Sequence, residues 1–310
     1  MAIKRFELGG FGIALTANRQ QAGLHFSLSG SLWERIARKL LARRAASYRG
    51  EMEAEAANDE TDSAERATSV PAEILNRINL VDWYHTINLG SGVVTRGMFD
   101  HGAILDRYRL PERLDGKRVL DVATFDGFWA FEFEKRGAKE VIALDLEGPM
   151  DLDWPPNRLA QATAQEEGLR FGEGFALAKE QLGSSVQRVA CNIYDLKPET
   201  FGTFDVVHSG DLLLHLNSPI KALQNMARVC TDYALVSDAY FPDLDCLGSR
   251  KVLEYLGGRD GPSWWRMSLR TLEEMIRDAG FSRVELLNKF SQGYRNGAGA
   301  LQHAVFKAYK

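Results

Sequence analysis

The sequence predicts an α/β protein with a mostly parallel, doubly wound sheet. From Arg118 onward, short apolar runs alternate regularly with helix-like segments. The runs are apolar throughout instead of alternating with polar residues, which is typical of strands that are buried on both faces. The last two runs have no helix between them, which predicts an antiparallel hairpin at the edge of the sheet.

The individual elements follow from the positions of these runs. Strands are expected at 118–124, 140–146, 186–193, 204–210, 233–240, 283–290 and 302–309. Helices are expected at about 128–136, 175–182 and 219–229, and another in "SLRTLEEMIRDAGF" after Ser268. Serine is a favoured N-cap residue, so Ser268 is the expected start of that helix.

The chain before residue 71 is expected to form a small module, 1–50, and a linker, 51–70. Two strand-like runs around a polar turn within 6–30 indicate a hairpin. Ser31 and Glu34 have the spacing of a capping box and predict an amphipathic helix with a basic face. That helix is a candidate for contact with RNA or a membrane surface, or for docking on the protein itself. The linker is acidic and poor in large apolar residues, and 71–310 forms the main domain.

Composition limits the class of protein. The formal charge of −4 gives no general reason to expect nucleic-acid binding. Three widely spaced cysteines (Cys191, Cys230 and Cys246) predict reduced thiols, with no disulfide framework and no metal site. There is no apolar run of the roughly 20 residues that a membrane helix needs. The first residues also lack a signal-peptide core, so we expect a cytoplasmic protein with no membrane partner.

Polar residues at the strand ends predict a ligand site. In an open sheet of this kind, ligands bind beyond the carboxyl ends of the strands. Asp145 follows Asp121 by 24 residues, near the spacing at which a carboxylate accepts hydrogen bonds from a ribose. Asp195 is expected to accept from an adenine amino group. A single aspartate at a strand end is also typical of a helix cap. The prediction of a ligand site therefore depends on Asp121, Asp145 and Asp195 together.

The turn after the first strand, "ATFDG", lacks most of the glycines of a diphosphate-binding turn. Phe125 and Asp126 stand where a pyrophosphate would lie, and only Gly127 leaves room for a ligand near the backbone. Bulk and like charge disfavour a dinucleotide. The turn instead favours an adenosine cofactor without phosphate, such as S-adenosylmethionine.

From about Leu80 onward, the sequence resembles the class I S-adenosylmethionine-dependent methyltransferases. Within that class it is similar to the branch of the tRNA wobble-uridine methyltransferases that complete 5-oxyacetyluridine. The resemblance is carried by "WYHTINLGSGVVTRG", "VLDVATFDGFWAFEFEKRGA", "FDVVHSGDLLLHLNSP" and "WWRMSLRTLEEMIRDAGF". It implies a Rossmann-like sheet of seven strands in the order 3-2-1-4-5-7-6, with the seventh antiparallel.

The resemblance also implies a set of site residues. "DVATFDG" takes the place of the general pattern DxGxGxG, with Ala123 and Phe125 in place of the first two glycines. Asp145 matches the acid that holds the ribose hydroxyls, and Asp195 the one near adenine. The expected cofactor-binding residues are Asp121, Ala123, Phe125, Gly127, Asp145, Leu146, Asn192, Asp195, His208 and Ser209.

Catalytic candidates lie near the fourth strand and before the main sheet. A general base helps when the methyl acceptor is a hydroxyl of high pKa. The candidates are His215, Asp211, His208 and His85, and a structural role for His215 in its leucine-rich surroundings is the alternative. Trp264 and Trp265 are expected either to face the acceptor or to pack. The long segment 146–174 is expected to be a lid or a substrate wall.

Three functions remain open from the sequence. The first is methyl transfer to an oxygen or nitrogen of a small-molecule acceptor, with S-adenosylmethionine as cofactor. The second is methylation of a tRNA wobble uridine, which would make tRNA a partner. The third is a non-catalytic protein that keeps the cofactor site. The lack of an inward-facing arginine in "ALQHAVFKAYK" favours the plain cofactor over a carboxylated form.

Overall fold

The computed structural model describes residues 2–8, 11–18, 21–28, 70–163, 167–245, 248–259, 262–295, 297 and 299–310. The chain divides into two compact units, Met1–Ala67 and Thr68–Lys310. No helix in the described ranges is long and apolar enough to cross a membrane.

The first unit contains three antiparallel strands, β1 (Ala2–Leu8), β2 (Phe11–Asn18) and β3 (Gln21–Leu28), in the order β1-β2-β3. The sequence predicted a hairpin of two strands, so that prediction is wrong by one strand. The reason is that the alternating run before Gly9 and Gly10 is long enough to pair with β2 along its whole length, from Ala2 opposite Ala17 to Leu8 opposite Phe11. The expected basic helix after Ser31 and the acidic linker lie outside the described residues.

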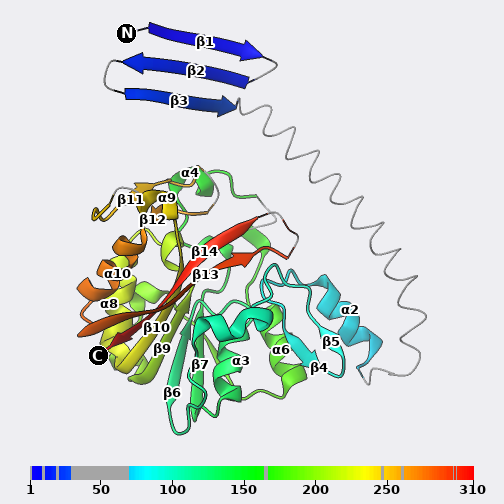
Figure 1. Ribbon diagram of the computed structural model, residues 1–310. Helices are drawn as coiled ribbons and strands as arrows, with labels where there is room; N and C mark the ends of the chain where they lie inside the picture. Colours follow the sequence, from blue (N-terminus) through cyan, green and yellow to red (C-terminus); the bar gives the residue numbers. More distant parts are fainter. Residues whose placement is uncertain are drawn as a thin grey trace. The chain divides into compact units, whose positions relative to one another are not determined.

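The second unit is built on a seven-stranded sheet with the order β8-β7-β6-β9-β10-β14-β13 (Figure 1). The strands are β6 (Arg118–Val122), β7 (Glu140–Asp145), β8 (Gln187–Ala190), β9 (Phe204–Gly210), β10 (Cys230–Tyr240), β13 (Arg283–Gly293) and β14 (Ala300–Tyr309). The first five strands are parallel, whereas β14 runs antiparallel to both β10 and β13. The predicted strand order, the edge hairpin and the Rossmann-like fold class are therefore confirmed.

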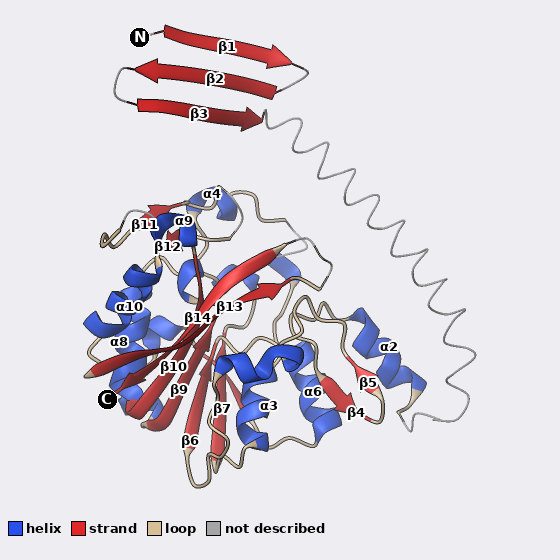
Figure 2. Ribbon diagram, viewed as in Figure 1, coloured by secondary structure: helices blue, strands red, loops and turns tan. Residues whose placement is uncertain are grey.

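Helices cover both faces of this sheet (Figure 2). Helices α8 (Pro219–Val229) and α10 (Leu269–Asp278) pack on one face, and α3 (Phe128–Lys135) and α6 (Glu173–Leu182) on the other. α8 begins at a proline, whose fixed φ suits the first helical position. α10 begins after Ser268, whose hydroxyl accepts a hydrogen bond from the backbone N–H of Thr271 at 3.2 Å, so the predicted cap is confirmed.

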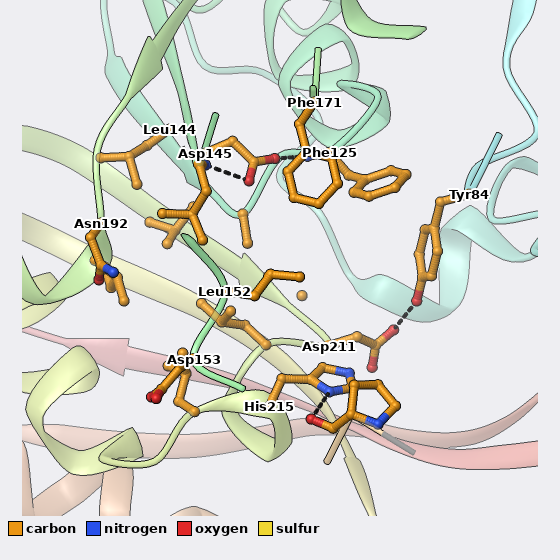
Figure 3. Close-up of a pocket in the computed structure, with 18 of the residues that line it drawn as sticks. Tyr84, Phe125, Leu144, Asp145, Leu152, Asp153, Phe171, Asn192, Asp211 and His215 are labelled. Carbon is orange, nitrogen blue, oxygen red and sulfur yellow. Dashed lines mark hydrogen bonds between the residues drawn. The ribbon is translucent and has the colours of Figure 1, made fainter. Parts of the chain in front are cut away.

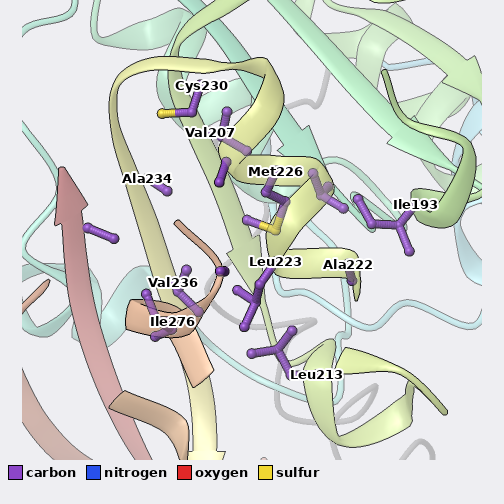
Figure 4. Close-up of a cluster of buried hydrophobic side chains, with 14 of the residues drawn as sticks. Ile193, Val207, Leu213, Ala222, Leu223, Met226, Cys230, Ala234, Val236 and Ile276 are labelled. Carbon is purple, nitrogen blue, oxygen red and sulfur yellow. The ribbon is translucent and has the colours of Figure 1, made fainter. Parts of the chain in front are cut away.

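Each strand contributes apolar side chains to both faces. In β6, Leu120 lies in the cluster under α8 and α10, whereas its neighbour Val119 lies in the cluster under α3 and α6. Figure 4 shows the first cluster, where Leu223 and Met226 of α8 and Ile276 of α10 meet side chains of the sheet. This two-sided burial is why the strands are apolar throughout.

The second unit also contains smaller elements. They are α2 (Ala72–Leu80), β4 (Asn88–Gly90), β5 (Val93–Val94), η1 (Gly102–Tyr108), η2 (Pro149–Asp151), α4 (Pro156–Leu159), η3 (Ile193–Asp195), α7 (Pro198–Phe201), η4 (Leu213–His215), α9 (Pro242–Asp245), β11 (Leu253–Tyr255) and β12 (Trp265–Met267).

The indole N–H of Trp264 donates to the carbonyl of Asp153 at 2.6 Å, and that of Trp265 to the carbonyl of Leu216 at 2.9 Å. These two tryptophans therefore pack between segments of the protein, which was one of the two roles expected from the sequence.

Candidate active site

A cavity of about 280 Å³ lies at the carboxyl ends of β6, β7 and β9. Its walls come from the turn after β6, the end of β7, the loop after β8, the end of β9 and the long segment after β7. Eight of the predicted site residues line it: His85, Ala123, Phe125, Asp145, Leu146, Asn192, Asp211 and His215. The sheet topology brings most of these distant segments together, because parallel strands end at one edge.

The turn from β6 to α3 takes up a glycine-like backbone without the glycines. Ala123 has φ +59° and Phe125 has φ +51°, both in the left-handed region that L-residues rarely occupy. They are two of the three positions at which the pattern DxGxGxG has glycine. Hydrogen bonds hold the turn in place: Ala123 N donates to the Leu144 carbonyl at 2.8 Å and Phe125 N to Asp145 Oδ2 at 2.6 Å.

The absence of a side chain at Gly127 makes room for neighbouring side chains of the protein and does not open a path for a ligand. Gly127 has φ +92°, and an added Cβ would lie 2.6 Å from the Phe131 ring and 2.7 Å from the Phe175 ring. Gly127 is not among the residues that line the cavity. The expectation that its missing side chain admits a ligand is therefore corrected, because two aromatic rings already occupy that space.

Asp145 presents a carboxylate to the cavity from the end of β7 (Figure 3). Its Oδ2 accepts from Phe125 N, and its Oδ1 accepts from Leu146 N at 2.7 Å. Burial raises the pKa of Asp145 above its ordinary value, and the two backbone N–H groups act in the opposite direction. Each carboxylate oxygen has a second lone pair, so both can also accept from a ligand hydroxyl.

Asp121 and His208 form a buried pair behind the cavity wall. Asp121 Oδ1 and His208 Nδ1 are 2.7 Å apart, and both side chains are 1% exposed. The two residues are register partners on neighbouring strands, and alternation along β6 turns Asp121 toward the α3 face. Ser209 is also fully buried and does not line the cavity.

The three strand-end carboxylates predicted to act together are thus not brought together. Asp195 is exposed on η3 and does not line the cavity, whereas Asn192 and Leu146 do. The Asn192 side chain accepts from Tyr194 N at 3.0 Å and begins η3, which turns Asp195 toward solvent. Of the three, only Asp145 lies at the cavity.

Asp126 ties the segment before β4 to the turn after β6. Its Oδ2 accepts from Tyr84 N at 2.9 Å and from His85 N at 2.8 Å, and its Oδ1 pairs with the His85 ring. The side chain is 3% exposed and is not part of the cavity wall. Asp126 therefore does not stand in a phosphate position as expected, but it brings Tyr84 and His85 to the cavity.

The opposite side of the cavity contains Asp211, His215 and Tyr84 (Figure 3). Asp211 Oδ1 lies 2.7 Å from Nε2 of His303, and the Tyr84 hydroxyl lies 3.5 Å from its Oδ2. Burial lowers the pKa of His215 below its ordinary value. Burial would also lower the pKa of His303, but Asp211 and then Asp238 raise it, and the result is a net increase.

Sequence reasoning missed several residues of this region, among them Tyr84, Trp129, Phe171 and His303. Tyr84 was visible only as the neighbour of His85, and Trp129 looked like an ordinary apolar position of a buried helix. Phe171 lies near the end of the long segment 146–174, and the composition of that segment does not predict its path. His303 did carry a signal, because it is a histidine directly before the apolar run "AVF" within a predicted strand.

The charged side chains that line the cavity are acidic. Among the described residues that line it, Asp145, Asp153 and Asp211 are carboxylates, and neither lysine nor arginine occurs. A ligand with a net negative charge would therefore meet repulsion without a compensating cation.

The comparisons with known proteins agree with this fold. Residues 101–286 match the family described as "Methyltransferase domain", and the chain belongs to this family. No curated protein matches the sequence significantly.

The chain is similar to several solved structures, and the two matches with a TM-score above 0.5 share its fold. The N-terminal domain of EvdMO1 with S-adenosylhomocysteine bound matches with a TM-score of 0.51 and 18% identity, over 77% of this chain and 96% of that chain. The same domain in the presence of S-adenosylhomocysteine and D-fucose matches with a TM-score of 0.51 and 18% identity, over 79% and 100%. The 1,6-didemethyltoxoflavin-N1-methyltransferase of Burkholderia thailandensis matches with a TM-score of 0.43 and 15% identity, over 99% of both chains.

Proposed function

We propose that this protein transfers a methyl group from S-adenosylmethionine to an oxygen or nitrogen of a small acceptor. The observation that carries the proposal is a cavity with a ribose-type carboxylate, Asp145, on one side and a polar cluster around Asp211 on the other. When bound, the cofactor supplies an electrophilic methyl carbon: the acceptor atom bonds to it, the carbon–sulfur bond breaks with its electron pair on sulfur, and the acceptor loses a proton.

The residues present fit the adenosine part of this cofactor. Asp145 accepts two backbone hydrogen bonds and keeps lone pairs for the two ribose hydroxyls. Asn192, Ile193 and Leu146 line the neighbouring wall, where they would enclose the adenine. The EvdMO1 domain, which shares this fold and has S-adenosylhomocysteine bound, supports the choice of cofactor.

Gly210 leaves a space that suits the amino-acid part of the cofactor. An added Cβ would lie 3.3 Å from Ser237 Oγ, 3.4 Å from Trp129 Nε1 and 3.4 Å from His208 Cε1. A side chain would therefore crowd a niche that carries two hydrogen-bond donors. In this proposal Trp129 and Ser237 hold the amino-acid end, and Gly210 keeps the niche open.

The acceptor would lie on the side of Asp211 and His215. Burial lowers the pKa of His215, which favours the neutral imidazole at pH 7. Its Nδ1 lies 3.4 Å from the carbonyl of Pro262, so a proton on that nitrogen leaves Nε2 as an acceptor. His215 is then suited to take the proton that the acceptor loses.

A tRNA wobble base is a weaker candidate for the acceptor. Binding of RNA depends mainly on cations that pair with phosphates. The described lining of the cavity offers three carboxylates and no lysine or arginine, and a carboxylated uridine would be repelled too. The basic helix that favoured RNA lies outside the described residues. The proposal therefore keeps a small acceptor and the plain cofactor.

Binding of S-adenosylhomocysteine by calorimetry tests the cofactor assignment. We expect Asp145→Asn to weaken binding about a hundredfold or more, because two hydrogen bonds to a charged group are worth about 1.5–3 kcal/mol each. Asp195→Asn, which changes an exposed carboxylate outside the cavity, is the matched control and should leave the affinity unchanged. No binding by the wild-type protein would refute the proposed cofactor. Equal affinity of the Asp145 variant would refute the ribose assignment.

A transfer assay separates an enzyme from a protein that only binds the cofactor. With methyl-labelled S-adenosylmethionine, a panel of small amines and hydroxy compounds should yield labelled product, whereas carboxylates and bulk tRNA should not. Labelled tRNA as the main product would overturn the choice of acceptor class. Cofactor binding without any transfer to the panel would favour the non-catalytic alternative.

A further inference from the structure

We propose that Asp211, held in place by His303, receives the N–H or O–H group of the methyl acceptor, and that the acceptor carries no net negative charge. The proposal rests on the proposed function and extends it by naming the anchoring group, its positioning residue and the class of acceptor. His303 was not a candidate at the level of sequence, and it touches the cavity only through Asp211.

The pair is built from two strands that are not neighbours. Asp211 directly follows β9, and His303 belongs to β14, with β10 lying between them in the sheet. His303 Nε2 lies 2.7 Å from Asp211 Oδ1, and its Nδ1 lies 3.4 Å from the carbonyl of Leu301. Both ring nitrogens thus face acceptors, which favours the doubly protonated ring as a double donor. The ring also stacks on Phe290 at 5.6 Å, so its orientation is fixed.

The second oxygen of Asp211 is left for a ligand. The Tyr84 hydroxyl lies 3.5 Å from Oδ2, at the outer limit of a hydrogen bond. The His303 side chain is fully buried, whereas the Asp211 side chain is 16% exposed and forms part of the cavity wall. One oxygen is therefore anchored inside the protein while the other points to the cavity.

A purely structural role explains this pair poorly. Asp211 has φ +49°, and such a conformation of a non-glycine residue costs about 1–3 kcal/mol unless its surroundings impose it. The following loop is already held by Asp238, whose Oδ2 accepts from Leu212 N at 3.1 Å and from Leu213 N at 2.8 Å. Asp211 is thus not needed to hold the loop, and a buried ion pair contributes little to net stability.

The charges around the pair define the acceptor. Asp238 and Tyr294 lie close enough to interact electrostatically with this cluster, and His215 and Tyr84 lie on the same side of the cavity as Asp211. With Asp153 also in the lining and no lysine or arginine among the described lining residues, a donor group that is neutral or cationic is favoured. Amines and hydroxy compounds meet that requirement, and carboxylates and phosphates do not.

Sinefungin tests the anchoring role without any knowledge of the acceptor. This analogue of the cofactor carries an amino group on carbon where the methylated sulfur would be, so it places N–H donors at the point of transfer. We expect the wild-type protein at pH 7.5 to bind sinefungin about tenfold or more tightly than S-adenosylhomocysteine, because a charge-assisted hydrogen bond forms with Asp211. In Asp211→Asn this preference should vanish while the affinity for S-adenosylhomocysteine stays the same.

Three further variants separate positioning from folding. His303→Gln keeps a donor to Asp211 and should keep most of the preference, whereas His303→Leu should lose it with unchanged affinity for S-adenosylhomocysteine. Asp195→Asn removes an exposed carboxylate outside the cavity and should keep the preference. An equal preference in wild type and Asp211→Asn, or its retention in His303→Leu, would overturn the proposal. Failure of the wild-type protein to bind either compound would instead refute the proposed function.

Discussion

Two residues at the start of α3 adopt a backbone conformation that normally requires glycine. Ala123 (φ +59°) and Phe125 (φ +51°) each have a Cβ that is disfavoured in the left-handed region by about 1–2 kcal/mol. Both backbone N–H groups are hydrogen-bonded to the end of β7, so the surroundings impose the conformation. Because the Phe125 side chain is part of the cavity wall, strain at this turn is coupled to the shape of the site.

Ala123→Gly should raise the free energy of unfolding by roughly 0.5–1 kcal/mol. Relief of the strain outweighs the larger conformational entropy that glycine gives the unfolded chain. Urea denaturation at constant m-value is the measurement. Ala130→Gly, in the buried interior of α3, is the control and should lower the unfolding free energy by about 1 kcal/mol. A loss of stability in Ala123→Gly would mean that the methyl group packs usefully in this conformation.

At the scale of elements, the long segment after β7 is fastened over the cavity by one carboxylate. Asp153 Oδ2 accepts from the Tyr194 hydroxyl and from Asn217 N, both at 2.6 Å. Its backbone carbonyl accepts from the indole N–H of Trp264. Burial and then the bond to Asp153 raise the pKa of Tyr194. Since Leu152, Trp154 and Phe171 of this segment line the cavity, these bonds decide how closed the cavity is.

Tyr194→Phe should loosen this segment without unfolding the sheet. It removes one hydrogen bond, worth about 0.5–1.5 kcal/mol net, so we expect hydrogen exchange in residues 147–155 to become about three- to tenfold faster. Tyr309→Phe deletes an exposed hydroxyl that donates to Glu285 at 3.1 Å and serves as the control. Unchanged exchange in the Tyr194 variant would show that Asn217 and Trp264 suffice to hold the segment.

At the scale of the whole molecule, a buried carboxyl makes stability depend on pH. Asp238 is completely buried, and burial together with the nearby Asp211 raises its pKa to about 7. The folded protein therefore holds a proton on Asp238 at pH values where the unfolded chain, with an ordinary carboxyl pKa of 3.8, has lost it. The free energy of unfolding must then fall as the pH rises from about 4 to about 7.

Asp238→Asn should flatten this dependence. Between pH 5 and pH 8 the wild-type protein should lose more unfolding free energy than the variant, by roughly 1 kcal/mol or more. His303, with its raised pKa, contributes stability below its unfolded pKa and loses it as the pH rises through the folded value. His101 and His215, with lowered pKa values, act in the opposite direction in both proteins. Parallel pH profiles from thermal melts would show that Asp238 does not change its protonation in this range.

Most of the fold was predictable because it rests on local patterns. Apolar runs of strand length, Ser268 as a cap and the missing helix before the last strand each have a direct physical meaning along the chain. The predicted bounds of α8 agree with the structure, and β9 agrees over its whole length. The sequence analysis missed one strand of the N-terminal unit. It treated the residues on both sides of Gly9 and Gly10 as one strand, whereas in the structure they form two paired strands, β1 and β2.

Part of the site was predictable for the same reason. A carboxylate at the end of a parallel strand must lie at the ligand-binding edge, which is how Asp145 and Asp211 could be named from the sequence. Which face a strand-end side chain takes, however, depends on alternation and on register with the neighbouring strand. That is why Asp121 lies against His208 under α3, and why Asp195 points to solvent.

The sequence by itself determined the α/β class, the order of strands and helices along the chain, and the edge of the sheet at which the cavity lies. Only the tertiary structure decided which side chains meet there: the ties of Asp126 to the Tyr84–His85 backbone, the pairing of Asp211 with His303, and the closure by the segment around Asp153. The physical reason is that strand and helix patterns are local in the chain, whereas each of these contacts joins residues at least 41 positions apart.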